Sequence, residues 1–481
     1  MGAASKIDEP PQRRLTLFER YALATANTGN PMIINYVVQY PAAEIPAVQA
    51  RLPDRIAYLQ EQLPMLSARL VDTQTTKPGW RAGPAWPTAA VLAAAGTPPP
   101  QHGESELAAI QRAELERFRA HDFAAGPVWS VRVFTTPDSA HGYVSFITNH
   151  VVVDGTGALR LVTHLLSAAA PTIPAEPFAS RAVYEKTHPI KPSVGFLLPV
   201  LWREIIVPNL PGFLQRKFSK GEPWPGIFES PLGKKLDMAL AGIPADVVAK
   251  LKTAAKARGV ATLHPVVQTA FAAAVWAVFH SDTEPALRFV TNVPKSERNM
   301  DKGHSSIGVY VALLESGGVM SGAQQFWAHA RAEAKTLKAP RTLAKGRMVV
   351  GLLGWIPDTG VQPAPKGVEG TTTGYERYLY ERSTASAPFF ESLMISNLGL
   401  WSLPEGATDG IWGQSNHPCA LALGSSVYSH DGGLRCSTTF WEGAPATRAQ
   451  VEHVHTVWMR LLERAADGLG NDATIAEATA D

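Results

Sequence analysis

A short stretch at residues 145–162, which reads SFITNHVVVDGTGALRLV, predicts a strand that ends in a tight turn and continues as a helix. Alternation along the strand puts His150 on the same face as Phe146 and Thr148. Asp154 stands where a helix N-cap is expected, because its carboxylate can accept hydrogen bonds from the first backbone N–H groups of the helix. The junction is therefore either ordinary strand–turn–helix punctuation or a device that holds His150 at a strand end for chemistry.

Strand and helix patterns alternate through two halves of similar content. Residues 1–175 mix strand-like runs with amphipathic helices, and residues 236–481 repeat this mixture, including a strand expected at 307–315. Residues 176–235 are rich in Pro, Gly and Lys and have no sustained period, which predicts a linker or crossover. A single core stops growing at about 250–300 residues, so a chain of 481 residues favours two α+β domains. A ligand site is expected in the cleft between them.

Charge and motif content exclude several classes of function. The 44 Lys and Arg residues nearly balance the 42 Asp and Glu residues, so the chain lacks the basic surface expected of a nucleic-acid-binding protein. No G-x-S-x-G, H-E-x-x-H, C-x-x-C or Walker sequence occurs, which argues against the usual serine hydrolases, zinc proteases and nucleotide-phosphate enzymes, and no metal is expected. The two cysteines cannot form a disulfide framework, and the N-terminal MGAASKIDEPPQRR lacks an apolar signal core. We therefore expect a cytoplasmic protein that is a monomer.

The most apolar segment, residues 194–214 (VGFLLPVLWREIIVPNLPGFL), is too interrupted to be expected to cross a membrane. Arg203, Glu204 and three prolines break it, and no apolar run reaches the roughly 20 residues that spanning requires. Two alternatives remain open. The segment is either a hydrophobic crossover packed between the domains or an interfacial patch that makes weak contact with a membrane or a lipid-like substrate.

The residues His150-x-x-x-Asp154-Gly155 resemble the H-x-x-x-D-G signature of the coenzyme A-dependent acyltransferase superfamily. This superfamily includes fungal alcohol acetyltransferases, plant BAHD acyltransferases, polyketide-associated acyltransferases and the condensation domains of peptide synthetases. Three further segments are similar to family elements in the expected order: LPMLSARL (63–70), HDFAAGPVWSVRVF (121–134) and MISNLG (394–399). Asn149 replaces the first histidine of the condensation-domain H-H-x-x-x-D-G, and the D-F-G-W-G of the plant branch is absent. The resemblance is therefore closest to the fungal alcohol acetyltransferase-like branch.

The resemblance implies a fold of two pseudo-duplicated chloramphenicol acetyltransferase-like domains with a tunnel between them. It makes His150 the general base and Asp154 a structural residue that fixes the turn, while Gly155 permits the tight turn and a close approach of the backbone to substrate. Family members often carry an arginine that pairs with the motif aspartate, and either Arg298 or Lys295 of TNVPKSERNM fits that role. The residues expected to touch the substrate or an oxyanion are Asn149, Ser396 and Asn397.

The reaction implied is transfer of an acyl group, most simply acetyl or another short chain, from acyl-coenzyme A to a hydroxyl of a small molecule. The acceptor attacks the thioester directly, so no covalent acyl-enzyme forms, and coenzyme A enters as a co-substrate rather than a permanently bound cofactor. Histidine suits both proton transfers because its unperturbed pKa lies near the operating pH. Two alternatives use the same fold with an amine acceptor or a carrier-protein donor. A third is a catalytically silent member that binds an acyl or lipid ligand.

Overall fold

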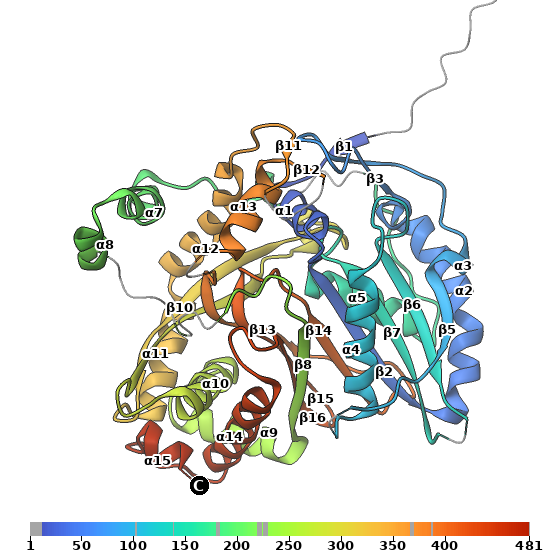
Figure 1. Ribbon diagram of the computed structural model, residues 1–481. Coiled ribbons are helices and arrows are strands. Elements are labelled where there is room, and N and C mark those ends of the chain that lie inside the picture. Colours follow the sequence, from blue (N-terminus) through green and yellow to red (C-terminus); the bar gives the residue numbers. More distant parts are fainter. Residues whose placement is uncertain are drawn as a thin grey trace, which may run out of the picture.

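Two large sheets with helices packed against them organise the chain (Figure 1), as the α+β class predicted from the sequence requires. The second half of the chain builds one sheet, and strands from both halves build the other. The computed structural model describes residues 12–101, 103–137, 139–178, 183–218, 224, 229–365, 370–385 and 388–480.

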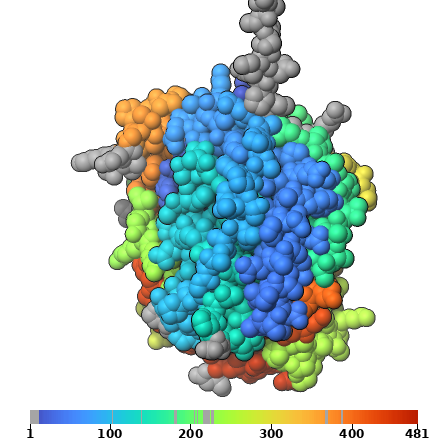
Figure 2. Space-filling view, turned by 90° about the vertical axis from the view of Figure 1, so that its right-hand side faces the viewer, coloured from blue at the N-terminus to red at the C-terminus, as the bar shows by residue number. Residues whose placement is uncertain are grey.

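The first sheet has five strands in the order β14-β2-β7-β6-β5. Helices α2 (Ile45–Gln62) and α5 (Gly155–Leu166) pack on one face and α4 (Glu106–Arg119) packs on the other. On the side of the molecule that lies on the right in Figure 1, the surface consists mostly of residues from the first half, coloured blue to cyan (Figure 2). The strands are β14 (Asp409–Gln414), β2 (Ile33–Pro41), β7 (His141–Asn149), β6 (Trp129–Thr135) and β5 (Leu92–Gly96).

The second sheet has six strands in the order β10-β9-β13-β15-β16-β8. Helix α10 (His264–Phe279) is apolar on nearly all sides and is buried, because it packs between the sheet and the neighbouring helices in one core. The strands are β10 (Val311–Ser321), β9 (Ala286–Ser296), β13 (Glu391–Leu400), β15 (Leu421–His430), β16 (Gly433–Trp441) and β8 (Leu236–Pro244). The helices around α10 are α9 (Ala245–Ala257), α11 (Phe326–Lys338), α14 (Arg448–Ala466) and α15 (Ile475–Thr479).

Shorter elements connect and cover these two sheets. Helix α1 (Leu17–Asn27) begins at Thr16, which forms a capping box with Glu19, and it contacts α13 of the second half. The remaining helices are α3 (Thr88–Val91), α6 (Tyr184–Thr187), α7 (Val194–Leu201), α8 (Gly212–Phe218), α12 (Pro340–Leu352) and α13 (Gly374–Ser383). The remaining strands are β1 (Gln12–Arg14), β3 (Arg69–Val71), β4 (Gly79–Arg81), β11 (Gln362–Pro363) and β12 (Thr371–Thr372).

Strand β14 joins the two halves, because it lies late in the sequence yet pairs with β2 in the first sheet. Its residue Trp412 is buried, stacks on Tyr36 of β2 with the ring centroids 5.9 Å apart, and donates its indole N–H to the Val427 carbonyl of β15 at 3.2 Å. One side chain therefore ties both sheets together. The division into domains at 1–175 and 236–481 stays a prediction, and the halves are linked by more than their connecting segment.

The predicted crossover at 176–235 contains α6, α7, a π-helical turn at Trp202–Ile206 and α8. Of the two alternatives for its apolar part, the packed crossover is wrong, because Val194 is 72% exposed and Phe213 is 70% exposed. Helices α7 and α8 stand out from the body of the molecule (Figure 1). Within the described residues, no helix is both long enough and apolar enough to cross a membrane.

Candidate active site

His150 follows the last residue of β7 and continues its alignment with β2. Its backbone N–H donates to the Met32 carbonyl at 2.7 Å, which holds the start of the turn against the neighbouring chain segment. The side chain is only 8% exposed, and its ring lies 5.0 Å from the ring of Phe18 on α1, measured between centroids. The histidine is therefore an interior residue, and its ring lies beside helix α1, which is not part of the sheet that carries His150.

The surroundings of the His150 ring favour its neutral form. Burial lowers the pKa of His150 below its usual value, although the nearby Asp154 carboxylate acts in the opposite direction. Among the residues the structure describes, none forms a hydrogen bond with the buried Nδ1 atom. A neutral imidazole at neutral pH can accept a proton, so the ring is suited to act as a base.

Asp154 is the N-cap of α5, as the sequence predicts. Its Oδ1 atom accepts from the Gly157 N–H at 2.7 Å, and its Oδ2 atom accepts from the Tyr310 N–H at 2.9 Å. The Arg298 guanidinium forms an ion pair with Oδ2 at 2.8 Å, and both side chains are almost completely buried. Because both oxygens are bonded to groups around the turn, Asp154 holds the turn in place.

Arg298 is the partner of Asp154, and Lys295 is exposed at the end of β9. The Arg298 guanidinium also donates to the Gly308 carbonyl at 2.7 Å and to the Ser305 carbonyl, and it lies 4.6 Å from the centre of the Tyr310 ring. These bonds explain how a buried charge is tolerated, since nearly every donor has an acceptor. Of the two sequence candidates, the structure places Arg298 in the role of the pairing cation.

The segment 304–310 of the second half is bonded directly to the turn of the first half. The Gly308 N–H donates to the Val152 carbonyl at 2.8 Å, and the Asp154 N–H donates to the Gly308 carbonyl at 3.2 Å. The strand expected at 307–315 is wrong at its start, because β10 begins at Val311 and the preceding residues form this loop. The backbone groups of this loop bond to the turn after β7. The apolar run in the sequence did not indicate that the loop would have the turn as its partner.

Glu176 adds a second link that the sequence did not reveal. Its carboxylate accepts from the Ser306 N–H at 2.6 Å and from the Ser305 hydroxyl, and its own N–H donates to the Gln62 carbonyl at 2.8 Å. The residue lies in a Pro-rich stretch without periodicity, so no pattern marks it. Its position strengthens the attachment of segment 304–310 to the first half.

The glycine that the turn requires is Gly157 and not Gly155. A Cβ atom at 157 would lie 2.8 Å from the Ser306 carbonyl oxygen and 2.8 Å from the Arg298 guanidinium, and would also collide with Val153. A Cβ atom at 155 would meet Trp412 at 3.4 Å, an ordinary contact, and Gly155 does not have a positive φ. The expectation that Gly155 permits the turn is therefore wrong, since the crowding occurs where Arg298 crosses the start of α5.

Asn149 occupies a capping position. Its Oδ1 atom accepts from the Val151 N–H at 2.8 Å, so the side chain stabilises the turn after β7. Its Nδ2 atom is buried, and no described residue accepts a hydrogen bond from it. A direct role toward substrate stays a prediction.

Ser396 and Asn397 lie on β13, close to the turn but without a bond to it among the described residues. Ser396 is buried, and the Asn397 Oδ1 atom accepts from the Gly399 N–H at 2.8 Å where the strand bulges. The next residue, Leu398, would be 3.5 Å from a Cβ atom at Gly155, so the segment reaches the start of α5. The roles of Ser396 and Asn397 toward substrate or oxyanion stay predictions.

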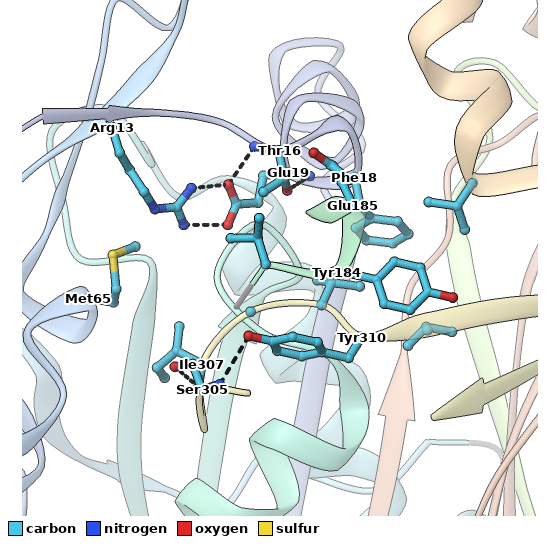
Figure 3. A pocket seen from close by; sticks show the side chains of 15 residues that line it. Arg13, Thr16, Phe18, Glu19, Met65, Tyr184, Glu185, Ser305, Ile307 and Tyr310 are labelled. Carbon is cyan, nitrogen blue, oxygen red and sulfur yellow. Dashed lines mark hydrogen bonds and ion pairs between the residues drawn. The ribbon is translucent and has the colours of Figure 1, made fainter. Parts of the chain in front are cut away.

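A small hollow that opens to solvent lies beside Phe18. The rings of Phe18, Tyr184 and Tyr310 lie around it, and the Arg13–Glu19 pair, with contacts of 2.6 and 2.8 Å, borders it on one side (Figure 3). Phe18 thus touches both the hollow and the His150 ring. Residues of both halves line the hollow. A tunnel that runs between the halves stays a prediction.

Comparison with known proteins gives the fold. No protein-family model and no curated protein matches the chain. Solved structures match over nearly its whole length. The cyclization-docking bidomain of EpoB from Sorangium cellulosum has a TM-score of 0.60 at 12% identity, covering 97% of this chain and 87% of that chain. A wax ester synthase/diacylglycerol acyltransferase from Marinobacter aquaeolei VT8 has a TM-score of 0.55 at 15% identity, covering 95% and 100%.

Two further matches extend this likeness to peptide synthetases. The first condensation domain of the CDA synthetase has a TM-score of 0.55 at 14% identity, covering 97% of this chain and 98% of that chain. The nonribosomal peptide synthetase FmoA3 has a TM-score of 0.57 at 17% identity, and this chain spans 44% of its length. The chain therefore has the two-lobed fold that condensation domains share with this wax ester synthase, as the sequence resemblance implied.

The crowding at Gly157 predicts different effects for two matched substitutions. Gly157→Ala should lower the thermal unfolding midpoint by several degrees, because the new methyl group must displace backbone at Ser306 or the guanidinium of Arg298. Gly155→Ala should leave the midpoint unchanged or raise it slightly, since alanine is favoured over glycine in the first turn of a helix. Equal midpoints for the two variants would contradict the assignment.

Proposed function

We propose that this protein is an acyltransferase in which His150 is the general base. The observation that carries the proposal is a buried histidine at the start of the turn that bonds the two halves of a condensation-domain fold to one another. The acyl donor is a coenzyme A thioester, and the acceptor is a hydroxyl group of a small molecule. This preference for donor and acceptor rests on the sequence resemblance at His150, Asp154 and the segment 394–399.

The reaction proceeds by direct attack. His150 takes the proton of the acceptor hydroxyl while its oxygen forms a bond to the thioester carbonyl carbon. The tetrahedral intermediate then breaks its C–S bond, and the protonated His150 returns the proton to the leaving thiolate. Base catalysis of this kind contributes about 10²–10⁴-fold, and the remainder comes from holding the donor and acceptor together in the correct orientation.

The oxyanion of that intermediate needs a hydrogen-bond donor. The Gly157 N–H is engaged by Asp154, so it is not free for this purpose. The Asn397 side chain uses its Oδ1 atom within its own strand, which leaves the NH2 group for substrate. Asn397 and a backbone N–H near Gly155 are the donors we favour.

We place the apolar part of a substrate at the hollow beside Phe18. Its wall combines aromatic rings with Met65, Ile307 and Val350, and Phe18 separates it from His150. A largely apolar acceptor or acyl group bound there would lie on the other side of Phe18 from the histidine, so its reactive end would have to pass the Phe18 ring. Amine acceptors and carrier-protein donors would use the same base, and they are included in the test below.

Substitution of His150 tests the proposal. Purified protein is offered short and longer acyl-coenzyme A esters, and acyl thioesters of a carrier protein, with panels of alcohols and amines, and free thiol release and product mass are followed. His150→Ala should lower kcat by roughly 10²–10⁴-fold with an unchanged circular dichroism spectrum, because the fold does not depend on a hydrogen bond from the Nδ1 atom of this ring. His141→Ala, at the other end of the same strand, is the matched control and should keep full turnover.

Two outcomes would contradict the proposal. Turnover of His150→Ala equal to that of the wild type would remove His150 from the mechanism. Stoichiometric binding of an acyl or lipid ligand without turnover of any donor, including carrier-protein thioesters, would identify a silent binding protein.

The pH dependence of kcat/KM supplies an independent check. The neutral ring is the active form, so kcat/KM should fall as the pH drops through the pKa of His150 and should be constant above it. Burial lowers this pKa below the ordinary value of 6.5, so the midpoint of the acid limb should lie below pH 6.5. A midpoint above pH 6.5, or an identical acid limb in the residual activity of His150→Ala, would show that another group limits the rate.

A further inference from the structure

Residues 194–218, here called the arm, leave the body of the molecule between two fixed points. At the first, the Ser193 N–H lies 3.3 Å from the Met348 sulfur on α12, and the Ile190 carbonyl packs against Gly351. At the second, Trp224 is buried and its N–H donates to the Arg288 carbonyl of β9 at 2.7 Å. Figure 1 shows α7 and α8 standing away from the body between these points.

The arm exposes large apolar side chains along most of its described length. Helix α7 carries no charged residue and buries no residue, although an apolar helix of a globular protein is normally buried. Exposed apolar groups this close together mark a surface that meets something other than water. The exposed apolar residues of the arm include Val194, Leu198, Trp202, Ile205, Phe213 and Phe218.

The two helical parts of the arm form one surface. The ring of Trp202, at the end of α7, packs edge-to-face against the ring of Phe218, at the end of α8, with centroids 5.5 Å apart. This contact brings together two residues that are separated by the prolines of the arm. The apolar groups are therefore presented by a folded hairpin.

The charge of the arm and its flanks selects one kind of partner. In the sequence, residues 188–222 carry cations at Lys191, Arg203, Arg216, Lys217 and Lys220, against carboxylates at Glu204 and Glu222. A sequence that combines several cations with apolar residues and a tryptophan is typical of segments that lie in the interface of an anionic bilayer. There the tryptophan ring sits at headgroup depth and the cations meet lipid phosphates.

We propose that the arm binds the surface of an anionic lipid bilayer. Its apolar side chains enter the boundary between headgroups and acyl chains, and the flanking lysines and arginines remain at the headgroups. The segment lies on the membrane and does not span it, because charges and prolines interrupt the apolar run. This binding does not depend on acyl transfer and is tested separately from it.

Flotation of the full chain with lipid vesicles tests the proposal. The wild type should float with phosphatidylcholine vesicles that contain about 30% phosphatidylserine, and less with phosphatidylcholine alone. Added salt should weaken this binding, because it screens the attraction between the cations and the lipid. The variant Leu198→Ser/Phe213→Ser should lose at least about tenfold in partitioning, since two apolar side chains no longer leave water on binding.

The matched control is Val319→Ser/Leu400→Ser, which removes two similarly exposed apolar side chains elsewhere on the surface and should bind as the wild type does. Both variants should keep the wild-type melting temperature, because all four side chains face water. The proposal is overturned if the wild type does not float, if both vesicle types bind equally, or if the arm variant binds normally. Self-association of the wild type that the arm variant abolishes, without vesicle binding, would instead identify an interface between copies of this chain.

Discussion

The buried ion pair between Asp154 and Arg298 is the interaction on which the site depends. Removing two charges from water costs several kcal/mol per ion, so a pair this deeply buried persists only when its remaining donors and acceptors are also bonded. Here the carboxylate accepts from the backbone N–H groups of Gly157 and Tyr310, and the guanidinium donates to carbonyl groups of segment 304–310. The pair therefore locks the turn after β7 against the second half, and the direction of His150 follows from the turn.

The same turn is held from its other side by β2, against which the second half packs its strand β14. The Tyr36 hydroxyl donates to the Gly155 carbonyl at 2.7 Å, and its ring stacks on Trp412 of β14. His150 thus stands between two attachments of one half to the other, next to the hollow behind Phe18. Helix α12 connects this region to the arm, because it carries Val350 in the wall of the hollow and Met348 at the first fixed point of the arm.

Local chemistry was predictable from the sequence, and distant partners were not. The end of β7, the cap at Asp154 and the start of α5 follow from alternation and capping preferences, and the resemblance pointed to Arg298 as one of two candidate cations. The need for glycine at 157 arises partly because Arg298 and Ser306 of the second half lie against the start of α5, and the sequence of the helix alone cannot show such partners. An apolar run likewise does not say whether another element covers it, so the exposure of the arm required the structure.

A double-mutant cycle on Asp154→Asn and Arg298→Leu, measured by guanidinium denaturation, tests the central claim most directly. Each single variant leaves a buried polar group without its partner and should lose about 3–5 kcal/mol of stability. The double variant should lose little more than either single variant, which gives a coupling energy of at least about 1.5 kcal/mol. Losses that simply add would contradict the account, because the two side chains would then stabilise the fold independently of each other.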